Sequence, residues 1–169
     1  MPQFFSKFAT MKTITPDMAY TRAAALCSRS EHAASDISAK LTAWGLPHSQ
    51  AHAIIDRLVS ENFINEQRYA HAFAHDKHAY NGWGAVKIAH QLRTKGIPQE
   101  YIDEAIASID PDDYQATLMK LLRDKWRSVS RREPQLARAA MLRFAASRGF
   151  EPSLIYNAVD HVINDAQQD

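Results

Sequence analysis

The sequence contains few of the residues that support disulfides, β-rich loops or membrane spans. Cys27 is the only cysteine among 169 residues, which excludes an intramolecular disulfide and a multi-cysteine zinc site. Five glycines and seven prolines are few for a loop-rich β protein of this length, and no apolar run approaches the roughly 18 residues of a membrane span. Alanine is abundant instead, together with leucine, isoleucine, glutamine, arginine and lysine, which favours helix. Without a disulfide or a membrane span, we expect a reduced cytoplasmic protein, in which Cys27 lies in an alanine- and leucine-rich run as a small buried hydrophobe.

Three segments share one pattern, in which a helical run ends at a glycine and a second helix follows. The glycines are Gly45, Gly96 and Gly149. A glycine at this point suits the left-handed C′ position of a Schellman cap, in which the residue four before it packs against the residue after it. The expected pairs are Leu41 with Leu46, Leu92 with Ile97, and Ala145 with Phe150.

The second helix of each segment carries a matched apolar stripe. A proline lies near the start of each one, where the missing N–H costs nothing. Steps of four and then three residues place the apolar positions on one helical face. The positions are Ala51, Ile55 and Leu58, then Ile102, Ile106 and Ile109, then Ile155, Val159 and Val162.

A further helix precedes each pair, with start signals at Thr15-Pro16, Asn65-Glu66 and Asp110-Pro111. The sequence therefore predicts an all-α fold of three tandem three-helix modules that resemble helix-turn-helix units. Their short joints favour an elongated, curved array. We expect modules at 15–63, 64–110 and 111–163, an N-terminal extension at 1–14 for which disorder is one interpretation, and a C-terminal tail at 164–169.

Charge is distributed unevenly. Residues 97–113 contain six acidic residues and no lysine or arginine, whereas residues 114–148 contain nine basic residues against two acidic ones. The basic segment could neutralise nucleic-acid phosphates or face an acidic protein surface. It could also be a solvated helix face, or pair with the acidic stretch inside the molecule.

Three histidines, His71, His75 and His78, are spaced for one face of a helix and could present imidazoles to a metal. No further ligand is specified by the sequence, so we expect a solvent-facing stripe opposite Tyr69 and Phe73 and no metal site.

No catalytic motif organises the Ser, His and Asp residues, and no enzyme activity or cofactor is expected. Gly82-Trp83-Gly84 lacks the lysine and hydroxyl of a phosphate-binding loop, so its glycines are expected to break the chain and let Trp83 pack. No Arg or Lys follows the three cap glycines at the start of the second helices, so major-groove DNA reading is not expected.

The middle of the chain carries a recognisable motif. Residues 58–73 read Leu-Val-Ser-Glu-Asn-Phe-Ile-Asn-Glu-Gln-Arg-Tyr-Ala-His-Ala-Phe, and residues 84–97 read Gly-x3-Ile-x3-Leu-x2-Lys-Gly-Ile. These residues resemble the RecX family, the regulators of the bacterial RecA recombinase. The resemblance covers about 16–162 and is strongest over 58–110; Asn65 stands where the family usually has Asp, and both cap helices well.

The resemblance implies a small monomeric protein without a membrane segment that binds within the groove of a RecA filament on single-stranded DNA. There it would restrain filament growth, ATP hydrolysis and strand exchange in DNA repair and the SOS response. The alternatives are a protein that binds single-stranded nucleic acid directly and a helical scaffold for another partner. The candidate partner-binding residues are Arg68, Lys95, Lys120, Arg123, Lys125, Arg127, Arg131, Arg132, Arg138 and Arg143.

Overall fold

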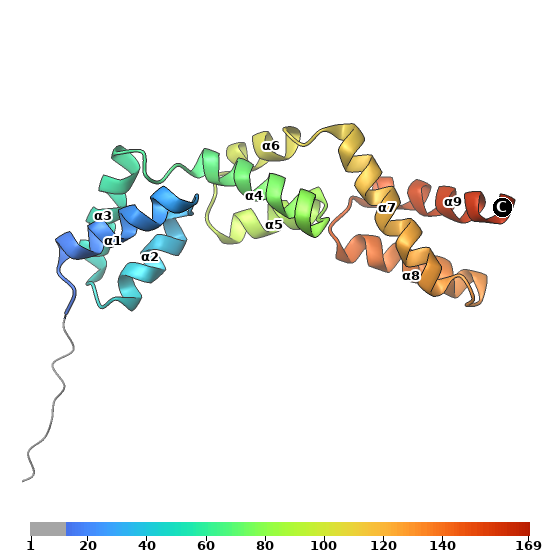
Figure 1. Ribbon diagram of the computed structural model, residues 1–169, viewed down its shortest axis with the longest axis horizontal. Helices are drawn as coiled ribbons and strands as arrows, with labels where there is room; N and C mark the ends of the chain where they lie inside the picture. The colour runs from blue at the N-terminus through green and yellow to red at the C-terminus, as the bar shows by residue number, and fades with distance from the viewer. Residues whose placement is uncertain (1–12) are drawn as a thin grey trace, which may run out of the picture. The chain divides into compact units, whose positions relative to one another are not determined.

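The computed structural model describes residues 13–169, and all regular structure in that range is helical (Figure 1). The chain divides into two compact units, one that ends at Ile64 and one that begins at Asn65. The expected N-terminal extension lies outside the described residues except at its end, where Ile14 packs against the core of the first unit.

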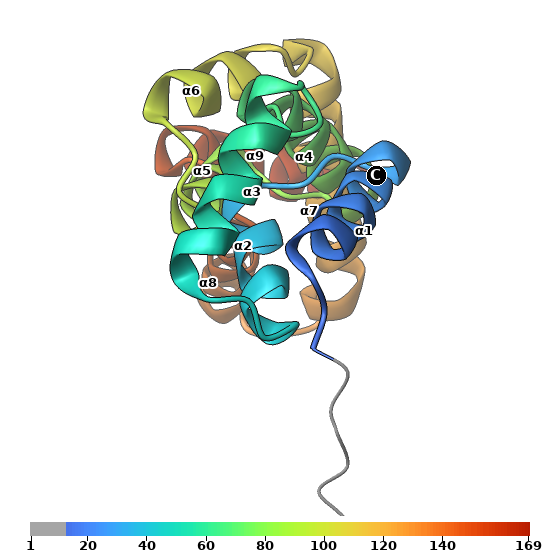
Figure 2. The same ribbon diagram turned by 90° about the vertical axis from the view of Figure 1, so that its left-hand side faces the viewer.

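The first unit is a bundle of three helices (Figure 2). They are α1 (Pro16–Arg29), α2 (Ala34–Ala43) and α3 (His48–Ser60). As predicted, Thr15 begins α1, since its hydroxyl accepts a hydrogen bond from the Met18 amide at 3.2 Å. Cys27 is buried in the core of this unit, as expected of a small hydrophobe.

The second unit contains two more three-helix bundles. The first consists of α4 (Glu66–Asn81), α5 (Ala85–Thr94) and α6 (Gln99–Ala107), and the second of α7 (Pro111–Val129), α8 (Pro134–Ser147) and α9 (Pro152–Gln168). Asn65 and Asp110 cap α4 and α7, as their positions in the sequence predict. The helix α9 continues to Gln168, so residues 164–168 of the expected tail are helical.

All three predicted glycine caps form. In each, the amide after the glycine donates to the carbonyl oxygen four residues before the glycine: Leu46 to Leu41 at 3.2 Å, Ile97 to Leu92 at 3.1 Å, and Phe150 to Ala145 at 3.3 Å. The φ angles of Gly45, Gly96 and Gly149 are 92°, 78° and 90°. Both side chains of every pair are buried, so each cap closes a helix and adds to a core in one step.

The predicted stripe on the second helices is correct at most positions and wrong at its centre in two modules. Ile54 and Ala105 are buried, whereas Ile55 and Ile106 are only half-buried. The third module buries both neighbours, Ala158 and Val159, and Ile109 lies beyond the end of α6 and is half-buried. A step of three followed by a step of four is as compatible with a helical face as the reverse, so spacing could not decide the register.

Backbone-to-backbone contact joins the two bundles of the second unit. The Gly84 amide donates to the Arg148 carbonyl at 2.8 Å, and the Val86 amide donates to the Gly149 carbonyl at 2.9 Å. A Cβ atom on Gly84 would lie 2.5 Å from the Gly149 backbone. This approach is possible only without a side chain at Gly84.

Tyr114 also connects the two bundles of the second unit. Its hydroxyl accepts a hydrogen bond from the Ala85 amide at 2.9 Å and donates one to Glu151 Oε2 at 2.6 Å. Its ring stacks on His78 and packs against Phe150, with both centroid distances at 5.2 Å. Burial, followed by the hydrogen bond to Glu151, raises the pKa of Tyr114 far above its ordinary value.

Candidate partner-binding surface

The outer face of α7 presents a stripe of three cations: Lys120, Arg123 and Arg127. Their spacing of three and four residues places them on one side of the helix, and all three are exposed. The opposite side of α7 is buried through Leu118 and Leu122, among others, which fixes the direction in which the stripe points. The core of the third bundle therefore orients this cationic face toward solvent.

The stripe continues into the turn between α7 and α8. Arg131 and Arg132 are both exposed there, and their side chains make no hydrogen bond or ion pair with any described residue. Within the stripe, Arg127 lies 3.4 Å from Asp124, but both side chains are more than half exposed. An exposed ion pair of this kind contributes little to stability, so Arg127 remains available to bind a partner. We call Lys120, Arg123, Arg127, Arg131 and Arg132 the α7 basic stripe.

Three other candidates of this module do not belong to the α7 basic stripe. Lys125 lies on the buried side of α7, with its ammonium 5.3 Å from the centre of the Phe144 ring. Arg138 on α8 is held by Asp160 through two hydrogen bonds of 2.8 and 3.3 Å. Hydrogen bonding from Arg138 lowers the pKa of Asp160. Arg143 is exposed on α8, outside α7 and its turn.

The last two candidates lie in the second module. Arg68 is in the first turn of α4 and Lys95 caps the end of α5. Both are half-buried, and each already has an interaction within the protein. The ten candidates are thus not one patch; five of them form the α7 basic stripe.

Among the described residues, the acidic stretch forms no ion pair with the basic segment. Among the described residues, the ion pairs of residues 114–148 are those of Arg127 with Asp124 and Arg138 with Asp160, and neither involves residues 97–113. Three acidic side chains of that stretch lie at the N-terminus of α7, where negative charge is favourable. Asp110 caps the helix by accepting hydrogen bonds from the Asp112 and Asp113 amides.

The expected solvent-facing histidine stripe is wrong at one position. His75 is exposed and His71 half-buried, but His78 is only 6% exposed and stacks on Tyr114. The sequence pattern missed this because the covering ring comes from the next bundle. Over residues 13–169, no group of His, Cys, Asp and Glu side chains is arranged to hold a metal ion.

A second cationic feature, which the sequence did not reveal, surrounds Trp83. The ammonium groups of Lys77 and Lys87 lie 4.9 and 4.5 Å from the centre of its ring, and Phe73 packs edge-on against it. Trp83 does pack between the glycines, as expected, and it also gathers two lysines around one aromatic ring.

Comparison with known proteins identifies the family. A family model described as RecX, second three-helix domain, matches residues 65–106, and one described as RecX, third three-helix domain, matches residues 112–159. A regulatory protein RecX from Xanthomonas axonopodis pv. citri is 32% identical over 145 residues, which cover 85% of this chain and 87% of the relative. The chain belongs to the RecX family. A further regulatory protein RecX, from Pseudomonas entomophila, is 28% identical and is covered over 89% of its length.

Solved structures of RecX proteins share the fold. A crystal structure of regulatory protein RecX matches with a TM-score of 0.78 at 23% identity, covering 86% of this chain and 71% of that one. RecX from Lactobacillus salivarius matches with a TM-score of 0.75 at 16% identity, covering 87% and 96%. The all-α fold of tandem three-helix modules is therefore that of RecX. No helix among the described residues is long and apolar enough to cross a bilayer.

Proposed function

We propose that this RecX protein regulates the RecA recombinase by binding its nucleoprotein filament as a cytoplasmic monomer. Binding restrains filament growth, ATP hydrolysis and strand exchange during DNA repair and the SOS response. Membership of a family whose curated members are named regulatory proteins supports a regulatory role. The observation that carries the proposal further is the α7 basic stripe, a row of exposed cations with few internal partners.

The geometry of the stripe suits a filament of protein on DNA. Lys120 and Arg127 are seven residues apart on one helix, so they span roughly 10 Å along its axis. Arg131 and Arg132 extend the row beyond the helix end. A cationic row of this length can contact several phosphates or an acidic ridge of protein, and long-range attraction would also speed its association.

The test is the rate of ATP hydrolysis by RecA on single-stranded DNA. Adding the protein to preformed filaments should slow hydrolysis, and changing Arg127, Arg131 and Arg132 to Glu should raise the concentration needed for half-inhibition by at least about tenfold. A loss of two or more contacts at about 1 kcal/mol each would produce that change.

A matched control carries the same change of net charge elsewhere. Arg29, Lys40 and Arg93 are exposed on α1, α2 and α5, and changing all three to Glu should leave inhibition within about twofold of the wild type. Equal loss in both triple variants would show that net charge matters rather than the stripe. No slowing of hydrolysis by excess wild-type protein would reject the proposal as a whole.

Direct binding of single-stranded nucleic acid is a second candidate function, favoured by Trp83 between Lys77 and Lys87. Aromatic rings with nearby cations are common in sites that bind single strands. Titration of labelled single-stranded DNA without RecA, at several salt concentrations, tests it. Strong binding with a steep loss as salt rises would favour this function, and weak binding in the absence of RecA would favour the filament.

A further inference from the structure

Three cations gather around the short connection between α4 and α5. The ammonium groups of Lys77 and Lys87 lie against the Trp83 ring, at 4.9 and 4.5 Å from its centre. Arg148 reaches the same connection from the end of α8, since its Nη2 lies 3.8 Å from the position that a Cβ atom on Gly82 would occupy. We call Lys77, Lys87, Arg148 and Trp83 the Trp83 cluster.

The charge of the Trp83 cluster is not balanced inside the protein. The side chains of its three cations form no hydrogen bond and no ion pair with any residue of the described range 13–169. All three residues are half-buried, which limits the screening of their charges by water. Like charges held around one ring repel each other, so an anion bound between them would be stabilised.

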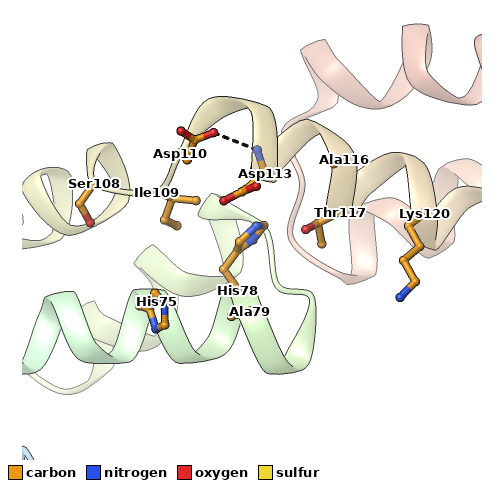
Figure 3. Close-up of a pocket in the computed structure, with 10 residues that line it drawn as sticks. All are labelled: His75, His78, Ala79, Ser108, Ile109, Asp110, Asp113, Ala116, Thr117 and Lys120. Atoms are coloured by element: carbon orange, nitrogen blue, oxygen red, sulfur yellow. Dashed lines mark hydrogen bonds between the residues drawn. The ribbon is translucent and has the colours of Figure 1, made fainter.

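The acidic N-terminus of α7 faces a different side of α4. Two aspartates of that N-terminus line a cleft with His75 and His78 of α4 (Figure 3). Lys77 and Tyr80 do not line this cleft, and their spacing along the helix places them on another side of α4 from the two histidines. The carboxylates of α7 are therefore not arranged to neutralise the Trp83 cluster.

An exposed aromatic ring lies beside the Trp83 cluster. Tyr80 follows Lys77 by three residues on α4, so their side chains are neighbours on the surface of the helix. Tyr80 is 80% exposed, and its ring packs on no ring or cation among the residues that the structure describes. Exposed aromatic rings next to cations are the surfaces on which proteins stack the bases of single strands.

We propose that the Trp83 cluster and Tyr80 bind one nucleotide, held by its phosphate and its base. The phosphate lies between the ammonium groups of Lys77 and Lys87, which the Trp83 ring holds in place, and the base stacks on the Tyr80 ring. A nucleotide fits better than an acidic protein segment, because carboxylates would leave the Tyr80 ring without a partner and lysine is depleted in protein interfaces.

The nucleotide belongs to a single strand, and in this respect the inference rests on the second candidate function. A site for one nucleotide binds weakly by itself. It suits a contact that forms once the α7 basic stripe has brought the protein to a filament, where the local concentration of the strand is high.

The test uses the full chain without RecA. In a Trp44→Phe, Trp126→Phe background Trp83 is the only tryptophan, so its fluorescence reports on the Trp83 cluster. A short oligothymidylate is titrated at low salt, and we expect a saturable change with a dissociation constant of roughly 0.1–1 mM. The logarithm of the binding constant should fall with the logarithm of the salt concentration with a slope of about −1.4, as for two lysines on a single strand.

Two other probes identify the ligand. An oligoglutamate peptide of equal charge should bind at least about tenfold more weakly than the strand, because it offers no ring to Tyr80. Equal binding of this peptide would overturn the nucleotide in favour of an acidic protein. Thymidine monophosphate should also bind more weakly than the strand; equal affinity would support the site and assign it to a free nucleotide. No saturable change with either the strand or the monophosphate would overturn the site.

Matched variants locate the binding. Lys77→Gln should weaken oligothymidylate at least about fivefold and reduce the salt slope by about 0.7, whereas Lys40→Gln, the same change on exposed α2, should do neither. Tyr80→Ser should weaken it about fivefold or more, whereas Tyr156→Ser, at a tyrosine that is 54% exposed on α9, should not. All four side chains lie at least partly in solvent, so the variants should fold.

The outcomes separate this site from the proposed functions. If the strand binds and neither Lys77→Gln nor Tyr80→Ser weakens it, direct binding of single strands stands and this site is wrong. Because the titration contains no RecA, inhibition of ATP hydrolysis can fail while the nucleotide site stands, and the reverse holds as well.

Discussion

The close approach of Gly84 to the turn at Gly149 predicts a large effect of a single methyl group. Gly84 has φ of −86° and ψ of 171°, which alanine adopts freely, so Gly84→Ala introduces no backbone strain of its own. Its Cβ, however, would lie 2.5 Å from three backbone atoms of Gly149 and Phe150, where ordinary contact begins near 3.4 Å. The two segments would have to separate by about 1 Å.

That separation would break most of the contacts between the two segments. The hydrogen bonds from Gly84 and Val86, now 2.8 and 2.9 Å long, would exceed 3.5 Å. Two lost hydrogen bonds and disturbed packing give an expected destabilisation of the second unit of about 2–4 kcal/mol. With a urea m-value of about 2 kcal/mol/M, the midpoint of unfolding should fall by roughly 1–2 M.

Gly96→Ala is the matched control. Gly96 needs a left-handed φ of 78° but has no atom within 4 Å of an added Cβ, so the cost is backbone strain alone, about 1 kcal/mol. Urea unfolding is followed by tryptophan fluorescence in a Trp44→Phe background, where Trp83 and Trp126 report only on the second unit. Hydrogen exchange at residue 84 and Val86 reports on the joint itself. If Gly84→Ala costs no more than Gly96→Ala and both amides stay protected, the proposed contact is wrong.

Two further predictions concern single polar side chains. Tyr114→Phe leaves the Ala85 amide and Glu151 without their shared hydroxyl, so urea unfolding should show a loss of about 1–3 kcal/mol in the second unit; a neutral effect would mean that water replaces the hydroxyl. Hydrogen bonds from Tyr20 and then Arg57 lower the pKa of Glu61. The stability that the Glu61 carboxylate gives to the first unit is therefore present above pH 4.5, its ordinary pKa, and is lost as pH falls through the lowered pKa. Glu61→Gln should therefore destabilise the first unit at neutral pH, with a difference from the wild type that disappears in acid. A constant difference across the titration, followed by Trp44 fluorescence in a Trp83→Phe, Trp126→Phe background, would contradict the assignment.

The sequence by itself determined the three-helix pattern, the starts of α1, α4 and α7, and the glycine caps. The reason is that these features are local. A Schellman cap is closed by hydrogen bonds that span no more than five residues, as between Leu92 and Ile97, and the N-cap of Asn65 reaches only to Arg68. The identity of a few neighbouring residues is then sufficient to predict the geometry.

Only the tertiary structure decided which polar residues are buried and which cations are available. His78 lies in a helical pattern that predicts exposure, and it is buried because Tyr114 from the next bundle covers it. The Tyr114 hydroxyl joins residues 29 and 37 positions away along the chain. No periodicity specifies such contacts, because they depend on how two bundles pack.

The same distinction applies to the candidate surface. By sequence alone, Lys125 and Arg138 belong to the same basic segment as Arg127. In the structure, however, Lys125 packs on the Phe144 ring and Arg138 donates a hydrogen bond to Asp160. Composition sets the number of charges in a segment, whereas the buried face of each helix sets the direction in which they point. The sequence therefore predicted a basic module, and the packing of α7 against α8 and α9 selected the α7 basic stripe within it.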